Sequence, residues 1–129
     1  MKKKSFLRIL IIGFCLFLAL GAAAQDWNYI DSYDGVSVYW RCRKEAYATK
    51  YISEIKLENN NDYKVEVRFK SVFVCASGEE YVGGGDQLTI GANSSKAGQY
   101  AGLWYYPCGN GDRPEKGGYR DMSVKKVVY

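Results

Sequence analysis

Residues 36–43, Val-Ser-Val-Tyr-Trp-Arg-Cys-Arg, are the stretch of sequence that decides the fold class. Apolar side chains occupy every second position, and polar or amphipathic side chains fill the positions between them. Successive side chains of a strand point to opposite faces, so this period of two predicts a half-buried β-strand. Trp40 is expected on its inner face and Tyr39 on its outer face. The preceding Asp34-Gly35 is a turn signal.

The same alternation recurs along the rest of the chain, and no stretch shows sustained helical periodicity. It predicts strands over about 51–58, 64–75, 88–90, 100–108 and 119–129, with an edge strand at 26–30. The segments 76–86 and 109–118 are rich in glycine and are expected to be loops. We therefore predict one all-β domain over residues 25–129, a β-sandwich of six to seven antiparallel strands.

Charge predicts how the strands at 51–58 and 64–75 would pair as a hairpin. One register that keeps the apolar side chains on one face sets unlike charges opposite each other, whereas a shift of two residues sets like charges opposite. The favoured pairs are Glu58–Lys64, Lys56–Glu66 and Glu54–Arg68. Each such pair is worth about 0.2–1 kcal/mol, so three of them select the register. All six side chains are expected to face solvent.

Trp40 is expected to point inward, a cysteine lies close to it, and a late strand ends in Cys108. This layout resembles that of immunoglobulin-like and fibronectin-type domains. It also looks like small exported bacterial β-sandwich domains of unassigned function. The resemblance extends over most of residues 25–129 and contains no specific motif. It departs from the antibody pattern, in which a Trp follows a mid-strand Cys at a set spacing. It implies that strands 36–43 and 100–108 face each other across the sandwich, and it carries over no functional residue.

Three cysteines, Cys42, Cys75 and Cys108, follow residue 24. Tracing the strands alternately up and down places all three near one end of the sandwich. Because the immunoglobulin-like layout sets their strands face to face, Cys42 and Cys108 are the expected disulfide. Cys75 would then be a spare thiol that could join two chains as a dimer. The alternative, Cys75–Cys108, needs only a modest swing of the loop after Cys75.

Residues 1–24 have the pattern of a signal peptide. A basic start, Lys2 to Lys4, precedes an apolar run over 9–20, and Ala22 and Ala24 supply the small side chains before a cleavage site at Gln25. The apolar run is shorter than the ~20 residues that span a bilayer, so no membrane anchor is expected after cleavage. We predict a secreted or periplasmic protein, where the cysteines would meet oxidising conditions.

Charge and composition exclude several classes of function. Four of the 18 basic residues lie in the predicted signal peptide, which leaves 14 against 14 acidic residues. A neutral domain lacks the electrostatic footprint of a nucleic-acid binder. The chain has no histidine, which removes Ser-His-Asp and Cys-His catalysis and histidine-ligated zinc. The cysteine spacing has no close pair of the kind that zinc sites use.

Carboxylates are the remaining route to catalysis. Glu79, Glu80 and Asp86 lie in one segment, and Asp112 and Glu115 in another. A glycoside hydrolase needs two carboxyl groups at a defined separation in a cleft, and a domain this small offers little cleft. Oxygen ligands suited to calcium occur at 61–62 and 110–112 without the full twelve-residue loop pattern. Calcium binding is compatible with these segments, but we predict no catalytic residue, metal or cofactor.

Aromatic residues are the informative excess, since twelve Tyr and three Trp all lie after residue 24. Tyr and Trp combine apolar area with a polar edge and are enriched where proteins meet partners. In the competing interpretation, the core and the loops cover these rings, and the rings bind no partner. We predict a non-catalytic exported binding or interaction module for a protein or glycan, using Tyr39, Trp104, Tyr105 and Tyr106. The alternatives are a small carboxylate-dependent hydrolase, or a structural accessory subunit that assembles through its sheet edges.

Overall fold

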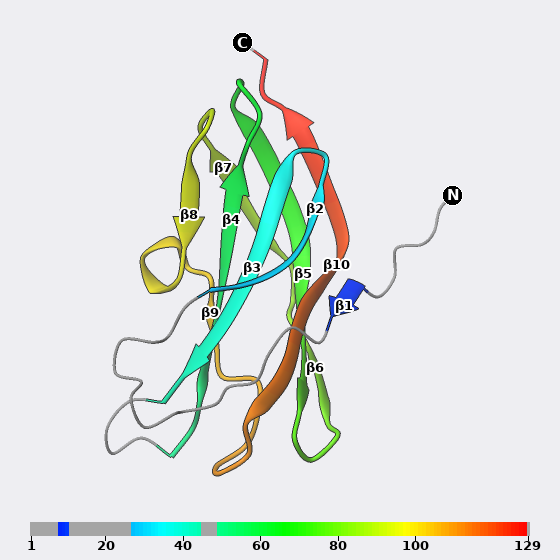
Figure 1. Cartoon of the computed structure of the whole chain (residues 1–129), viewed down its shortest axis with the longest axis vertical. Coiled ribbons are helices and arrows are strands. Elements are labelled where there is room, and N and C mark those ends of the chain that lie inside the picture. Colours follow the sequence, from blue (N-terminus) through cyan, green and yellow to red (C-terminus); the bar gives the residue numbers. More distant parts are fainter. Residues whose placement is uncertain (1–7, 11–26, 45–48, 129) are drawn as a thin grey trace.

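The structure is a computed structural model that describes residues 8–10, 27–44 and 49–128, with side chains from residue 27 onward. Two antiparallel sheets pack against each other as a sandwich (Figure 1). The predicted all-β class is confirmed. The predicted signal peptide and the cleavage site at Gln25 lie outside the described residues, apart from the backbone of 8–10.

Each sheet has five strands, which differ widely in length. The first sheet contains β1 (Arg8–Leu10), β10 (Pro114–Lys126), β5 (Val65–Cys75) and β6 (Glu80–Val82) in that order, with β7 (Asp86–Ile90) also beside β5. The second contains β2 (Asn28–Tyr33), β3 (Val36–Arg43), β4 (Ile52–Asn59) and β8 (Ser95–Ala97), with β9 (Trp104–Tyr105) also beside β4. A short 3-10 helix, η2 (Gln99–Ala101), interrupts the chain between β8 and β9.

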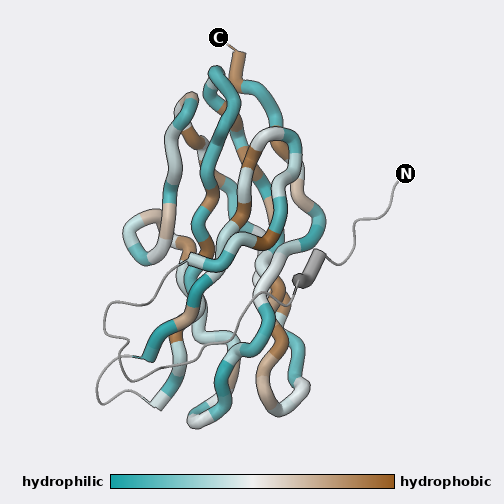
Figure 2. Tube along the Cα trace, viewed as in Figure 1, coloured by the Kyte–Doolittle hydropathy of each residue, from teal (hydrophilic) through white to brown (hydrophobic). Residues whose placement is uncertain are grey.

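The inner faces of both sheets form one hydrophobic core, and the alternation that predicts β3 is the alternation observed. Val38 and Trp40 are fully buried, while Tyr39 between them points outward and is half-buried. Across the core, Val67 and Phe73 of β5 are also fully buried. Figure 2 shows hydrophobic residues interspersed with hydrophilic ones along the strands, as expected when one face of each sheet is wet.

The predicted hairpin between β4 and β5 is wrong, because these strands lie in different sheets. β4 pairs with β3, β8 and β9, whereas β5 pairs with β10, β6 and β7. The chain crosses between the sheets after Asn59, whose buried side-chain amide donates to the carbonyl oxygens of Tyr63, Ile90 and Gly91. Two strands with one apolar face each can bury those faces across a core as well as side by side. Three surface charge pairs are too weak to decide between the two arrangements.

The structure has more than the six to seven predicted strands, because the shortest strands are too short to show the two-residue alternation of apolar and polar side chains. β6 falls in a segment expected to be a loop, and β8 lies between two predicted strands, 88–90 and 100–108; each is three residues long. Of the strand predicted over 100–108, only β9 forms, and it lies beside β4 in the same sheet as β3. Strands 36–43 and 100–108 therefore do not face each other. The structure is a β-sandwich that departs from the immunoglobulin-like expectation at this point.

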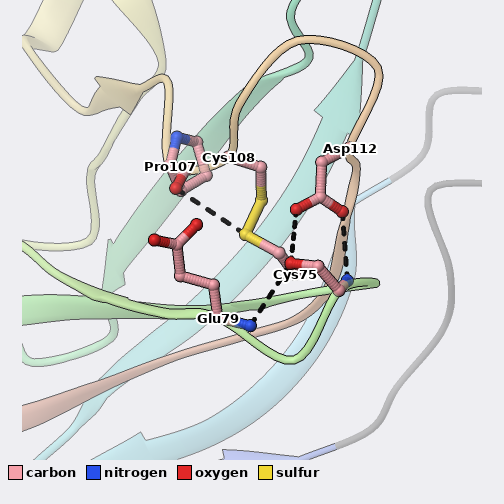
Figure 3. Close-up of a disulfide and its surroundings, with 6 residues drawn as sticks. Cys75, Glu79, Pro107, Cys108 and Asp112 are labelled. Atoms are coloured by element: carbon pink, nitrogen blue, oxygen red, sulfur yellow. Dashed lines mark hydrogen bonds between the residues drawn. A yellow bond between two sulfur atoms is a disulfide. The ribbon is translucent and has the colours of Figure 1, made fainter.

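The disulfide joins Cys75 to Cys108, with the Cα atoms 5.9 Å apart (Figure 3). The expected Cys42–Cys108 pair is wrong, and so is the spare thiol at Cys75 on which a disulfide-linked dimer would depend. No described cysteine is free. After β9 the chain leaves the second sheet and reaches the end of β5, where the Cys75 sulfur lies 3.6 Å from the Pro107 carbonyl oxygen. This crossing puts Cys108 beside Cys75.

Candidate functional site

The outward side of the second sheet gathers aromatic side chains from three strands, from the residue that precedes β2 and from the residue that follows β9. These residues, which we call the aromatic face, are Trp27, Tyr29, Tyr39, Trp104 and Tyr106. Tyr29 and Tyr106 are almost half exposed, at 48% and 46%. Of the four predicted binding residues, the structure brings Tyr39, Trp104 and Tyr106 to this one face.

One row of contacts runs across this face. Trp27 stacks on Arg41, whose guanidinium carbon lies 4.2 Å from the ring centroid. Arg41 Nε donates to Glu54 Oε1 at 2.9 Å. Glu54 is in register with Trp104 on β9, and the Trp104 and Tyr106 rings meet edge to face at 5.4 Å. The row therefore alternates aromatic rings with a charged pair.

A second row lies alongside, on the same strands. Tyr29 and Tyr39 meet edge to face at 5.5 Å, and the Lys56 ammonium lies 5.1 Å from the Tyr39 ring centroid. The Tyr39 hydroxyl donates to Glu58 Oε1 at 3.0 Å. Burial, and then the hydrogen bond to the Glu58 carboxylate, raise the pKa of Tyr39 above its ordinary value. Tyr39 is therefore a neutral donor with a fixed hydroxyl.

Glu54 anchors the middle of the aromatic face, although its side chain is only 3% exposed. Its Oε1 atom accepts from Arg41 and also from Arg43 Nε, at 3.4 Å. The Gly98 backbone closes over the other oxygen, because a Cβ at Gly98 would lie 2.8 Å from Glu54 Oε2. A buried carboxylate with two guanidinium partners holds their side chains in place.

Beside Glu54, the strand that pairs with β4 makes an excursion between β8 and β9. Gly98 N donates to the Ile55 carbonyl and Ile55 N donates to the Leu103 carbonyl, so both ends of the excursion stay attached to β4. The excursion itself is η2, and it presents Tyr100 to solvent with a fully exposed side chain.

Two cavities flank Tyr100 and share it as a wall. The first, about 210 Å³, lies over the Glu54 carboxylate and is also lined by Trp27, Arg41 and Arg43. The second, about 450 Å³, lies between Leu88 and the β8 strand. Its remaining lining residues are Ser95, Lys96, Ala97 and Ala101. Both cavities are open hollows at the margin of the aromatic face.

Tyr105, the fourth predicted binding residue, is not on this face. It points inward, where its ring packs 5.4 Å from Phe73 and its hydroxyl donates to Asp86 Oδ2 at 2.7 Å. Burial, and then the bond to Asp86, raise the pKa of Tyr105 well above its ordinary value. The alternation along 104–106 predicts opposite faces for neighbouring rings, and Tyr105 occupies the core side.

The candidate catalytic carboxylates are dispersed. Glu79 and Glu80 are exposed, and Glu80 lies 3.7 Å from Arg120. Asp86 accepts from Tyr105, and the cavity that it lines contains neither Glu79 nor Glu80. In the other segment, Asp112 accepts from the backbone and the hydroxyl of Ser77, at 3.1 and 2.6 Å (Figure 3). The remaining candidate, Glu115, pairs with an arginine two residues before it.

The segments considered for calcium use their side chains within the fold. Asn61 donates to the Asp34 carbonyl and to Asn59 Oδ1, and Asn110 Oδ1 accepts from Thr49. A cluster of three potential metal ligands does occur among the described residues. It consists of Cys75, Cys108 and Asp112, and its two sulfurs form the disulfide.

Comparisons with known proteins add little to this picture. No family model and no curated protein matches the chain. Its fold is similar to that of a DUF1425 family member from Shewanella sp. pv-4, with 8% sequence identity and a TM-score of 0.42, covering 83% of this chain and 94% of that one. A similarity this distant carries no argument about function. Within the described part of the chain, no helix is long and apolar enough to cross a membrane.

Sequence reasoning missed Trp27, Tyr29, Arg41, Glu54 and Tyr100 as members of the site. Trp27 and Tyr29 are two residues apart, and this spacing places both on one face of a strand. Glu54 was predicted to face solvent opposite Arg68. Its side chain does point away from the core, but the prediction of solvent exposure is wrong, because Arg41, Arg43 and Gly98 cover the carboxylate. Tyr100 carries no signal, because it was assigned to a strand that does not form there.

Proposed function

We propose that this protein is a non-catalytic binding module and that its aromatic face binds a glycan. The observation that carries the proposal is the row from Trp27 through Arg41 to Trp104, in which aromatic rings flank a partly exposed guanidinium that the buried Glu54 carboxylate holds in place. The apolar C–H face of a sugar stacks on an aromatic ring, and its hydroxyl groups need charged or polar partners beside that ring.

Charged residues of the same face argue against a protein partner. Charged residues other than arginine are depleted from the buried centre of a protein–protein interface. Here Lys56 and Glu58 lie among the rings, both in contact with Tyr39. An exported protein would meet glycans, and the disulfide fits an oxidising compartment.

The carboxylates support a non-catalytic role. Glycoside hydrolysis needs two carboxyl groups that flank the scissile glycosidic bond. Glu80 pairs with Arg120, and Asp86 with Tyr105. On the aromatic face, Glu54 has a buried carboxylate held by two arginines, which is a positioning role.

Binding to a glycan array, followed by calorimetry with the best oligosaccharide, tests this function. Tyr29→Ala and Tyr106→Ala remove the two most exposed rings of the face, and each is expected to weaken binding about tenfold, because stacked aromatic anchors dominate such surfaces. Tyr63→Ala is the matched control, since this tyrosine is 36% exposed and lies beside Lys126 of the other sheet. Equal losses in all three variants, or no glycan bound, would contradict the proposal. Cleavage of a bound glycan would contradict its non-catalytic part.

A further inference from the structure

We infer that Tyr100 and the two cavities beside it bind an acidic glycan, with one sugar unit on either side of the Tyr100 ring. This inference rests on the proposed glycan-binding function and specifies its ligand. The two cavities share Tyr100 and Ala97, so that a chain passing over the ring enters both.

Tyr100 combines an exposed ring with a well-anchored backbone. Its side chain is fully exposed, whereas backbone hydrogen bonds hold the turn that carries it. The Gly98 carbonyl accepts from Ala101 N at 3.1 Å and from Leu103 N at 2.9 Å, and Leu103 is buried in the core. An exposed tyrosine on a rigid turn offers a large contact area and loses little conformational entropy on binding.

The second cavity has the size and chemistry for a sugar ring. Leu88, Ala97 and Ala101 give it an apolar wall, and Tyr100 gives it an aromatic one. Ser95 and Lys96 supply the polar groups, and both are exposed at its margin. Its volume of about 450 Å³ is within the usual size range of small-ligand pockets, and its lining is more polar than theirs usually is, as suits a ligand rich in hydroxyl groups.

Charge selects an acidic sugar over a neutral one. The charged groups among the described residues that line the two cavities are Arg41, Arg43 and Lys96, against one carboxylate, Glu54. No described carboxylate lines the cavity that contains Lys96. A sugar carboxylate beside Lys96 would gain a charge-assisted hydrogen bond, which is stronger than a bond between neutral groups.

The test compares acidic oligosaccharides with neutral analogues of the same shape. Hexamers of polygalacturonate and of alginate, and the methyl esters of both, are titrated by calorimetry together with neutral glucose and xylose hexamers. We expect an acid to bind about tenfold more tightly than its methyl ester, because the ester replaces the charged carboxylate with a neutral group that carries one additional methyl. Added salt should narrow this difference.

Two variants separate the charge from the ring. Lys96→Gln should lower affinity for the acid severalfold and leave the methyl ester unchanged, whereas Tyr100→Ala should weaken both ligands. Lys125→Gln and Tyr63→Ala are the matched controls, since both residues are exposed and lie away from the cavities. These controls should bind like the natural protein.

The outcomes distinguish this inference from the function on which it rests. Equal affinity for acid and ester, or binding of the neutral hexamers alone, would overturn the acidic ligand and leave a glycan-binding module. Unchanged binding in both Lys96→Gln and Tyr100→Ala would overturn the site. Failure to bind any glycan would overturn both.

Discussion

Gly117 of β10 lies directly against the indole of Trp40, and through this contact the two sheets meet at the centre of the sandwich. A Cβ at Gly117 would lie 2.5 Å from the Trp40 Cγ atom. Trp40 is fully buried, so its ring has no room to retreat. The absence of a side chain at Gly117 therefore fixes how closely the sheets approach.

Replacing Gly117 with alanine should destabilise the protein by about 2 kcal/mol or more, as overpacking of a dense core does. Urea unfolding measures the change in the free energy of unfolding. Gly109→Ala is the control, because no atom lies within 4 Å of a Cβ at that position. A loss no greater than that of the control would mean that the sheets can separate to accept the methyl group.

Loss of the Cys75–Cys108 disulfide should lower the free energy of unfolding by about 4 kcal/mol. The bond closes a loop between residues 33 apart, and opening it restores chain entropy to the unfolded state. Cys75→Ser/Cys108→Ser is compared with the natural protein in urea. Peptide mapping without reduction should recover Cys75 linked to Cys108. Recovery of either cysteine linked to Cys42 would contradict the structure.

Glu54→Gln should destabilise the protein by about 2 kcal/mol, because it leaves two guanidinium groups beside a neutral amide. The arginine side chains keep about a quarter of their exposure, which limits the loss. Glu58→Gln is the control on the same strand and face, and it should cost about 0.5 kcal/mol, as at a half-exposed site. Equal costs in urea unfolding would show that Glu54 does not anchor the arginines.

Stability should fall in alkaline solution, and Tyr105 should account for part of the fall. Its folded-state pKa is raised, so Tyr105 stays protonated in the folded protein at a pH where the unfolded chain ionises it. The free energy of unfolding should therefore decline above about pH 10, by up to about 1.4 kcal/mol per pH unit for this group.

In Tyr105→Phe, the free energy of unfolding should decline less steeply above about pH 10, by up to about 1.4 kcal/mol per pH unit. Urea unfolding between pH 9 and pH 11, with tyrosinate absorbance as a second readout, tests the difference. Tyr63→Phe serves as the control at an exposed tyrosine. An unchanged slope in Tyr105→Phe would show that Tyr105 ionises in the folded state like an exposed tyrosine.

The sequence by itself determined which way each side chain of a strand points. Val38 and Trp40 face the core, and Tyr39 faces outward, as their alternation predicts. The same rule separates Trp104 and Tyr106 from Tyr105, although no sequence signal says which of the two sides is the core. The face of a strand on which a side chain lies depends only on its position along that strand, because the two-residue side-chain period is a property of the extended backbone.

The tertiary structure alone decided which strands are neighbours. Glu54 points outward as predicted, yet it meets Arg41 and Arg43 instead of Arg68, because β4 and β5 belong to different sheets. For the same reason Cys108 meets Cys75 and not Cys42. Strand order is set by burial of the whole core, and that free energy is far larger than the charge pairs and local turn preferences that can be inferred from sequence.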